Sequence, residues 1–150
     1  MAQSLAKIYL HIIFSTKNKE KLIKPEIEKD LHAYMAGILK NLDCTAIIIG
    51  GTNDHVHILN TFSRVITISK MLEILKKESS KWIKKRGLNY DNFYWQNGYG
   101  AFSVSQSRVE NVKKYIENQK SHHRTISFKE EFIRFLKEYN VEYDERYVWD

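Results

Sequence analysis

The feature that most constrains the fold is the change of hydrophobic period along the chain, between the two-residue period of strands and the three- to four-residue period of amphipathic helices. Four extended regions are predicted: Leu5–Thr16, Thr45–Ile49, His55–Phe62, and a region made of Phe93–Gln96 and Gly98–Ser105. Four helices are predicted: Pro25 to about Asn41, Thr67–Arg86, Ser107 to about His122, and one opening at Ser127. The order β-α-β-β-α-β-α-α indicates the α+β class, a ferredoxin-like split βαβ sheet with appended C-terminal helices.

Local signals mark several element ends. Pro25 suits the first turn of a helix, because it has no N–H to leave unpaired there. Ser107 with Glu110, and Ser127 with Glu130, have the spacing of a capping box. The glycines of Gly50-Gly51 suit the loop of a hairpin that returns through His55.

The chain is predicted to form one domain over residues 1–150, because it has no repeat, low-complexity stretch or Pro/Gly linker. No apolar run approaches the roughly 20 residues of a membrane-spanning helix, so no membrane partner is expected. The single cysteine, Cys44, cannot form an internal disulfide. We therefore expect a cytoplasmic protein in which Cys44 is a small buried hydrophobe.

The charge balance favours a polyanionic partner. The net charge is +6 and the pI is about 9.3, and phosphates neutralised by basic side chains release condensed counterions. The segment 64–86 has eight Lys or Arg against two acids. DNA binding is therefore predicted for a basic helix face, whose alternative is a merely solvated surface; its members are Lys76, Lys77, Lys81, Lys84, Lys85 and Arg86.

Aromatic residues follow this basic segment. Tyr94, Trp95, Tyr99 and Phe102 are candidates for stacking on unpaired bases. Core packing is the favoured alternative for Trp95 and Phe102.

Two short motifs carry the chemistry. In His55-Val56-His57 both imidazoles lie on one face of a strand, because successive side chains alternate between faces. Two imidazoles so placed can bind one cation, although an H-x-H pair is more often incidental. Tyr115 and Gln119 are four residues apart on a helix and so share a face. Alone, this pair is as well explained by core packing.

Taken together, these motifs resemble the HUH single-tyrosine transposases of insertion sequences that move as single-stranded DNA. The resemblance spans nearly the whole chain, from IYLHIIFSTK through the GGTNDHVHIL hairpin and YWQNGYGAFSVS to KKYIENQKSHHR. It implies that His55, His57 and Gln119 bind a divalent metal and that Tyr115 attacks DNA. It also implies that the substrate is single-stranded DNA with a hairpin.

These implied roles are chemically coherent. A metal on a phosphodiester oxygen withdraws charge and orients the phosphorus. Attack by Tyr115 gives a 5′-phosphotyrosine and a free 3′ hydroxyl, and the exchange of one phosphoester for another is reversible without ATP. Two imidazoles and an amide do not determine which divalent metal is bound, so the sequence does not distinguish Mg²⁺ from Mn²⁺. No general base is evident; His123 and Lys120 are accessory candidates.

Three alternatives stay open. A non-catalytic RNA-binding module would use stacking aromatics, and the segment from Gly98 to Phe102 faintly matches the RNP1 pattern. The match fails at Ala101, where an aromatic residue is expected, and at the preceding Asn97, where a basic residue is expected. A metal-dependent hydrolase would use His55, His57 and His123 and form no covalent adduct. A domesticated relative that processes repetitive hairpins would share every catalytic residue.

The resemblance further implies a homodimer in which the tyrosine helix of one chain completes the metal site of the other. Two sequence features are compatible with this arrangement. The strand Leu5–Thr16 would invite pairing if it were a bare edge. The segment Gly98–Gln106 would serve as a flexible lead-in that lets the following helix cross to the partner.

Overall fold

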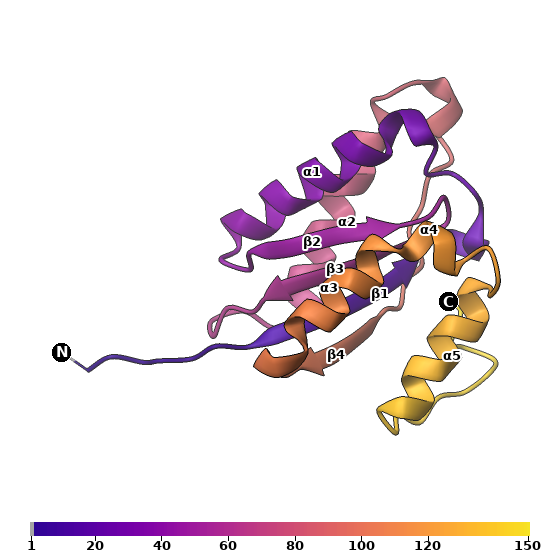
Figure 1. The fold of residues 1–150 in the computed structure, drawn as a ribbon. Helices are drawn as coiled ribbons and strands as arrows, with labels where there is room; N and C mark the ends of the chain where they lie inside the picture. Colours follow the sequence, from indigo (N-terminus) through magenta and orange to yellow (C-terminus); the bar gives the residue numbers. More distant parts are fainter. Residues whose placement is uncertain (1) are drawn as a thin grey trace.

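The computed structural model describes residues 2–150 and has a four-stranded sheet with helices on both faces (Figure 1). The strands are β1 (Tyr9–Ser15), β2 (Ala46–Gly51), β3 (His55–Thr61) and β4 (Gly100–Val104). The α-helices are α1 (Pro25–Asn41), α2 (Ile68–Lys84), α3 (Val109–Glu117), α4 (Gln119–His122) and α5 (Phe128–Glu138). Single 3₁₀ turns lie at Lys17–Lys19, Leu88–Tyr90 and Gln106–Arg108.

The sheet is antiparallel throughout, with the strand order β2-β3-β1-β4. This order, with α1 after β1 and α2 after β3, confirms the predicted α+β ferredoxin-like architecture with appended C-terminal helices. Strand β1 lies inside the sheet and pairs with both β3 and β4. The register opposes Ile13 to His57 and Ser15 to His55, which sets the histidine pair beside the end of β1.

Two helix layers cover the two faces of the sheet. Helices α1 and α2 pack on one face, where Ile12, Phe14, Val56 and Ile58 point into the main core. The opposite face is covered by α3, α4 and α5 (Figure 1). Leu59 contacts α3 and Ile13 contacts α5 there. Because side chains alternate along a strand, His55 and His57 belong to this second face.

Several helix ends follow the local rules. Pro25 occupies the first turn of α1, and the Thr67 hydroxyl caps α2 by accepting from the Lys70 N–H. Ser127 caps α5 by accepting from the Glu130 N–H, as predicted. Cys44 is buried, also as predicted.

The predicted cap at Ser107 is wrong. Helix α3 begins at Val109 with no side-chain cap, because the Ser107 hydroxyl bonds Ser105 within a 3₁₀ turn. The helix predicted through about His122 is interrupted at Asn118, which separates α3 from α4. Helix α3 also lies close to β2: a Cβ added at Gly50 would sit 2.7 Å from the Ile116 carbonyl oxygen. A glycine at that position therefore permits the approach of α3.

Two sequence features were compatible with a tyrosine helix that crosses to a partner chain, namely an exposed opening strand and a flexible lead-in, and the structure has neither in the described residues. The opening strand is not an edge, since β1 is paired on both sides. The segment Gly98–Gln106 contains β4, which is hydrogen-bonded to β1 and so is not a free lead-in. The edge strands are β2 and β4. Among residues 2–150, no helix combines the length and apolar character needed to cross a membrane.

Candidate active site

The histidine pair lies on β3 beneath the second helix layer. Both rings are completely buried, as are Val56 and Ile58 on the other face of the strand. The ring centroids of His55 and His57 are 5.2 Å apart. The alternation of β3 therefore presents two imidazoles side by side on one face, and turns the intervening apolar residues into the main core.

Each imidazole is held through its Nδ1 atom, which leaves Nε2 facing the space between the helices. His57 Nδ1 lies 2.8 Å from Nε2 of His11, a buried residue of β1. His55 Nδ1 lies 2.7 Å from Asp54 Oδ1 and 3.0 Å from the Thr52 hydroxyl. Partners of this kind fix the orientation of a metal-ligating histidine and leave its other nitrogen free to bind.

Gln119 and Tyr115 approach the histidines from α4 and α3. Gln119 is 1% exposed, and its Oε1 lies 3.0 Å from His55 Nε2. The Tyr115 ring lies 5.8 Å from the ring of His57, centroid to centroid. The break at Asn118 does not separate the two residues, because both still face the sheet. All four residues singled out in the sequence are thus brought together in one chain.

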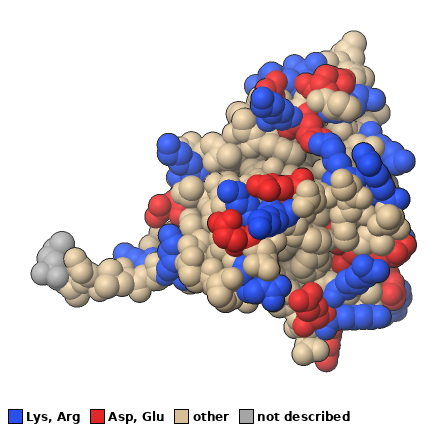
Figure 2. All heavy atoms as spheres, in the orientation of Figure 1, with Lys and Arg blue, Asp and Glu red and all other residues tan. Residues whose placement is uncertain are grey.

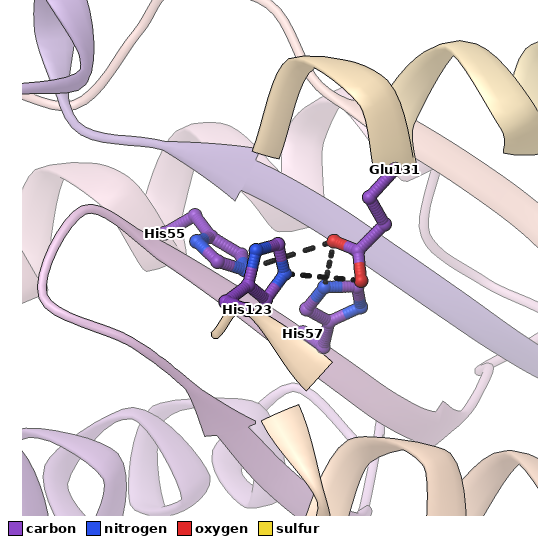
Figure 3. Close-up of side chains that lie close together, drawn as sticks. All are labelled: His55, His57, His123 and Glu131. Carbon is purple, nitrogen blue, oxygen red and sulfur yellow. Dashed lines mark hydrogen bonds and ion pairs between the residues drawn. The ribbon is translucent and has the colours of Figure 1, made fainter. Parts of the chain in front are cut away.

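A carboxylate that the sequence did not reveal lies at the centre of this group. Glu131 projects from α5 and is 1% exposed (Figure 3). Its Oε1 lies 2.8 Å from His57 Nε2 and 3.7 Å from His55 Nε2. Its Oε2 accepts hydrogen bonds from the Tyr115 hydroxyl and, at 3.1 Å, from the Gln119 side-chain amide.

The buried charges shift the pKa values of these groups. Burial lowers the pKa of His57 to about 4 despite its hydrogen bond with Glu131, so the ring is neutral near pH 7. Burial and the Glu131 carboxylate together raise the pKa of Tyr115 far above its ordinary range. Burial works against the charge of Glu131, but hydrogen bonds from its neighbours outweigh it and lower the pKa of the carboxyl. The arrangement therefore contains a neutral imidazole, an anionic carboxylate and a protonated phenol.

The donor set fits a divalent ion of the kind that the family resemblance implies. Ligands at right angles, each about 2.1 Å from an ion, are about 3.0 Å apart. The separations of 2.8 Å (His57 Nε2 to Glu131 Oε1) and 3.0 Å (His55 Nε2 to Gln119 Oε1) are of that size. Nitrogen ligation requires neutral imidazole, which burial of His57 supplies.

The two accessory candidates have different surroundings. His123 Nε2 lies 3.2 Å from Glu131 Oε2, so its ring belongs to the cluster (Figure 3). The two atoms are not aligned for a hydrogen bond. Lys120 pairs with Glu28 of α1 and is 69% exposed, and it lines the same cavity as His123. A cavity of about 550 Å³ reaches the cluster beside His123 and Asp54, with a floor that includes Ile23 and Phe128.

The basic helix lies away from these residues, because α2 covers the opposite face of the sheet. On the face that carries α3 and α5, basic and acidic residues are interspersed (Figure 2). Lys76 is not a free cation: its ammonium donates to the carbonyls of Gln96, Asn97 and Gly98. The others are at or near the surface, and Lys84 lies over the Tyr94 ring.

Two of the four aromatic candidates for base stacking are buried, and these are the two for which core packing was the favoured alternative. Trp95 and Phe102 are buried, at 7% and 3% exposed, and pack in the two cores. Tyr94 and Tyr99 are 52% and 38% exposed. Only the two tyrosines of this set are thus accessible to a base.

Comparisons with known proteins agree with this architecture. Residues 4–119 match the sequence profile of the family described as "Transposase IS200 like". A candidate transposase from Deinococcus radiodurans R1 superposes with a TM-score of 0.62 at 20% identity, covering 79% of this chain and 98% of its own. A REP-associated tyrosine transposase bound to a REP hairpin has the same TM-score at 12% identity, covering 84% of this chain and 74% of its own. A search of curated proteins found no match. Since the profile covers most of the sequence, the chain belongs to the IS200-like transposase family.

Proposed function

We propose that this transposase cuts and rejoins single-stranded DNA through a 5′-phosphotyrosine intermediate, with Tyr115 as the nucleophile. The observation that carries the proposal is the convergence of the Tyr115 hydroxyl with two buried imidazoles and an amide oxygen. The Tyr115 hydroxyl and His57 Nε2 contact the two oxygens of one carboxylate. The Glu131 carboxylate thus lies between the proposed nucleophile, Tyr115, and the candidate metal ligand His57.

The residues of the chain define the steps. Tyr115 gives its hydroxyl proton to solvent and its oxygen bonds to phosphorus, while the bond from phosphorus to the 3′ oxygen of the preceding nucleotide breaks and that oxygen takes up a proton from solvent. A divalent metal, Mg²⁺ or Mn²⁺, held by His55, His57 and Gln119 would supply Lewis-acid stabilisation of the phosphate. His11 and Asp54, which contact the Nδ1 atoms of His57 and His55, keep the two imidazoles oriented.

Burial of the site limits the form of the substrate. His55 and His57 have no exposed surface, and a cavity lined by His123 and Asp54 lies beside them. An unpaired strand enters such a space more readily than a duplex, whose major groove alone is about 12 Å across. We propose that a hairpin next to the cut site holds the strand in place; the solved relative that is bound to a REP hairpin supports this choice.

A denaturing gel tests the proposal. Labelled single-stranded oligonucleotides with the hairpins that flank the gene are incubated with the protein and Mn²⁺. We expect a covalent protein–DNA adduct and a free 3′ hydroxyl end, and no adduct with fully paired duplex. Cleavage without an adduct would instead support the metal-dependent hydrolase. Binding without cleavage would support the non-catalytic RNA-binding module if RNA is preferred.

We predict that exposed lysines of α2 contribute to DNA binding. Each phosphate contact adds about 0.7 to the slope of log affinity against log salt for single strands. Changing Lys77 and Lys81 of α2, and Lys85 directly after it, to Gln should therefore reduce that slope by about 2 and weaken binding at low salt. The slope is measured by fluorescence anisotropy between low and moderate salt.

A variant with the same change of charge serves as the control. Lys29, Lys40 and Lys137 are also exposed but lie outside α2, so if α2 is the surface that binds DNA their triple change to Gln should alter the slope much less. Equal effects of the two triple variants would show that net charge, and not α2, attracts the DNA.

The assembly of the active site is tested by mixing two inactive variants. In one chain, Tyr115 of α3 already contacts Glu131 beside its own His57. These contacts predict that a mixture of His57→Ala and Tyr115→Phe chains stays inactive. The composite homodimer that the resemblance implies predicts regained activity, so adduct formation after demonstrated subunit exchange would establish it.

A further inference from the structure

Helix α5 adds a charged group to a site that otherwise has only neutral donors. As metal ligands, imidazoles and an amide contribute no charge, and such a set does not discriminate strongly among divalent metals. Glu131 is the one carboxylate in the group of potential ligands that also contains His55, His57 and His123. It lies beyond residue 119, where the match to the family profile ends.

The two carboxylate oxygens face different partners. Oε1 lies 2.8 Å from His57 Nε2 and 3.7 Å from His55 Nε2. Oε2 accepts from the Tyr115 hydroxyl. Oε1 therefore lies near the Nε2 atoms of both β3 histidines, while Oε2 accepts from the nucleophile and also lies 3.2 Å from His123 Nε2.

The placement of this carboxylate is built into α5. Glu131 lies one turn from Phe128 and Phe135 and adjacent to Phe132, on the face that packs against the sheet. Burying a carboxylate in such surroundings is costly unless it is paired or binds a metal. The Ser127 cap starts the helix four residues earlier and so fixes the turn from which Glu131 points inward.

We propose that Glu131 is a ligand of the active-site metal, through Oε1, and that its Oε2 positions the Tyr115 hydroxyl beside that metal. This inference deepens the proposed function, on which it rests, because it concerns the metal of the same site. A carboxylate oxygen added to the set favours the harder ions Mg²⁺ and Mn²⁺ over softer ones. The net charge of the bound site falls by one, and the nucleophile and the metal are linked through three atoms of one side chain.

Metal binding without DNA tests the inference. Mn²⁺ is titrated into the full-length protein and free ion is followed by electron paramagnetic resonance. Glu131→Gln keeps the size of the side chain and one acceptor oxygen, but it removes the charge and replaces the second acceptor with an N–H donor. We expect Mn²⁺ affinity to fall by at least about 10-fold. Loss of a residue that only hydrogen-bonds to a metal ligand already lowers affinity by about that factor, and loss of a ligand should lower it at least as much. The control is Glu138→Gln, an exposed site on the same helix, which should bind Mn²⁺ as the unmodified chain does.

A second readout separates ligation from a structural role. Co²⁺ is used as a probe, because its visible absorption reports the ligands. Glu131→Gln should change the Co²⁺ spectrum, whereas Glu138→Gln should leave it unchanged. Should Glu131→Gln fail to fold, Glu131→Asp keeps a carboxylate one methylene shorter, and it should lower Mn²⁺ affinity while Glu138→Asp does not.

Two results would overturn the inference. Unchanged Mn²⁺ affinity with an unchanged Co²⁺ spectrum would show that Glu131 is not a ligand. Tighter Mn²⁺ binding by Glu131→Gln would show that the carboxylate competes with the ion for the histidines. Because no DNA is present, these results are independent of adduct formation. Glu131-dependent metal binding by a chain that never forms an adduct would leave this inference standing and remove the proposed function.

Discussion

Replacing Tyr115 with Phe is expected to abolish the covalent protein–DNA adduct and to lower strand cleavage by at least about 1000-fold, since the covalent route then has no nucleophile. The substitution removes one oxygen from a side chain whose ring stays packed between His57 and Phe135. The fold and the surface that binds DNA should therefore be preserved. The adduct is measured on a denaturing gel, and DNA affinity by anisotropy under the same conditions.

The matched control is Tyr147→Phe. Tyr147 is 62% exposed in the C-terminal segment, so loss of its hydroxyl should change neither adduct yield nor affinity. A persisting adduct in Tyr115→Phe would assign the nucleophile to another residue. Loss of DNA binding together with the adduct would show instead that the hydroxyl acts in binding, through its hydrogen bond to Glu131.

The histidine pair and the sheet could be predicted because they depend on local periodicity. A strand places alternate residues on one face, so His55 and His57 had to lie together if His55–Phe62 was extended. The split βαβ order follows in the same way from the alternation of two hydrophobic periods. Gln119 and Tyr115 could be paired because four residues span about one helical turn, and the break at Asn118 disturbs this only slightly.

Partners that are distant in sequence could not be found by such reasoning. His11 contacts His57 across 46 residues, through the pairing of β1 with β3. Glu131 meets His57 across 74 residues, because α5 folds back over the sheet. One signal was present: Glu131 interrupts the apolar stripe of Phe128, Phe132 and Phe135. A charge on a buried helix face needs a partner, but the sequence does not say which.

The position of the opening strand within the sheet was undetermined for a similar reason. Periodicity identified Leu5–Thr16 as extended, but whether a strand is central depends on which strands pair with it. The paired part, Tyr9–Ser15, is shorter and has β3 and β4 as neighbours. A strand buried on both faces reads as a nearly continuous apolar run, and the run from Leu10 to Phe14 was the sign of a central position.

Replacing His57 with Ala is expected to remove cleavage almost completely, by about 1000-fold or more. A Lewis acid contributes several kcal/mol to stabilising the charge of a phosphate transition state, and each 1.36 kcal/mol corresponds to a factor of ten in rate. His57 is central to the candidate metal ligands, because its Nε2 contacts Glu131 while its Nδ1 is oriented by His11. The adduct yield is measured across a Mn²⁺ titration.

Chelation separates loss of the metal from damage to the fold. Excess EDTA should stop cleavage by the unmodified chain, and added Mn²⁺ should restore it, whereas His57→Ala should stay inactive at every Mn²⁺ concentration. His32→Ala is the control, since His32 lies on α1 and its variant should respond to Mn²⁺ as the unmodified chain does. Undiminished cleavage in EDTA would exclude a metal role for the histidine pair. In that case the two imidazoles, with Glu131 between them and Tyr115, would have to act by proton transfer alone.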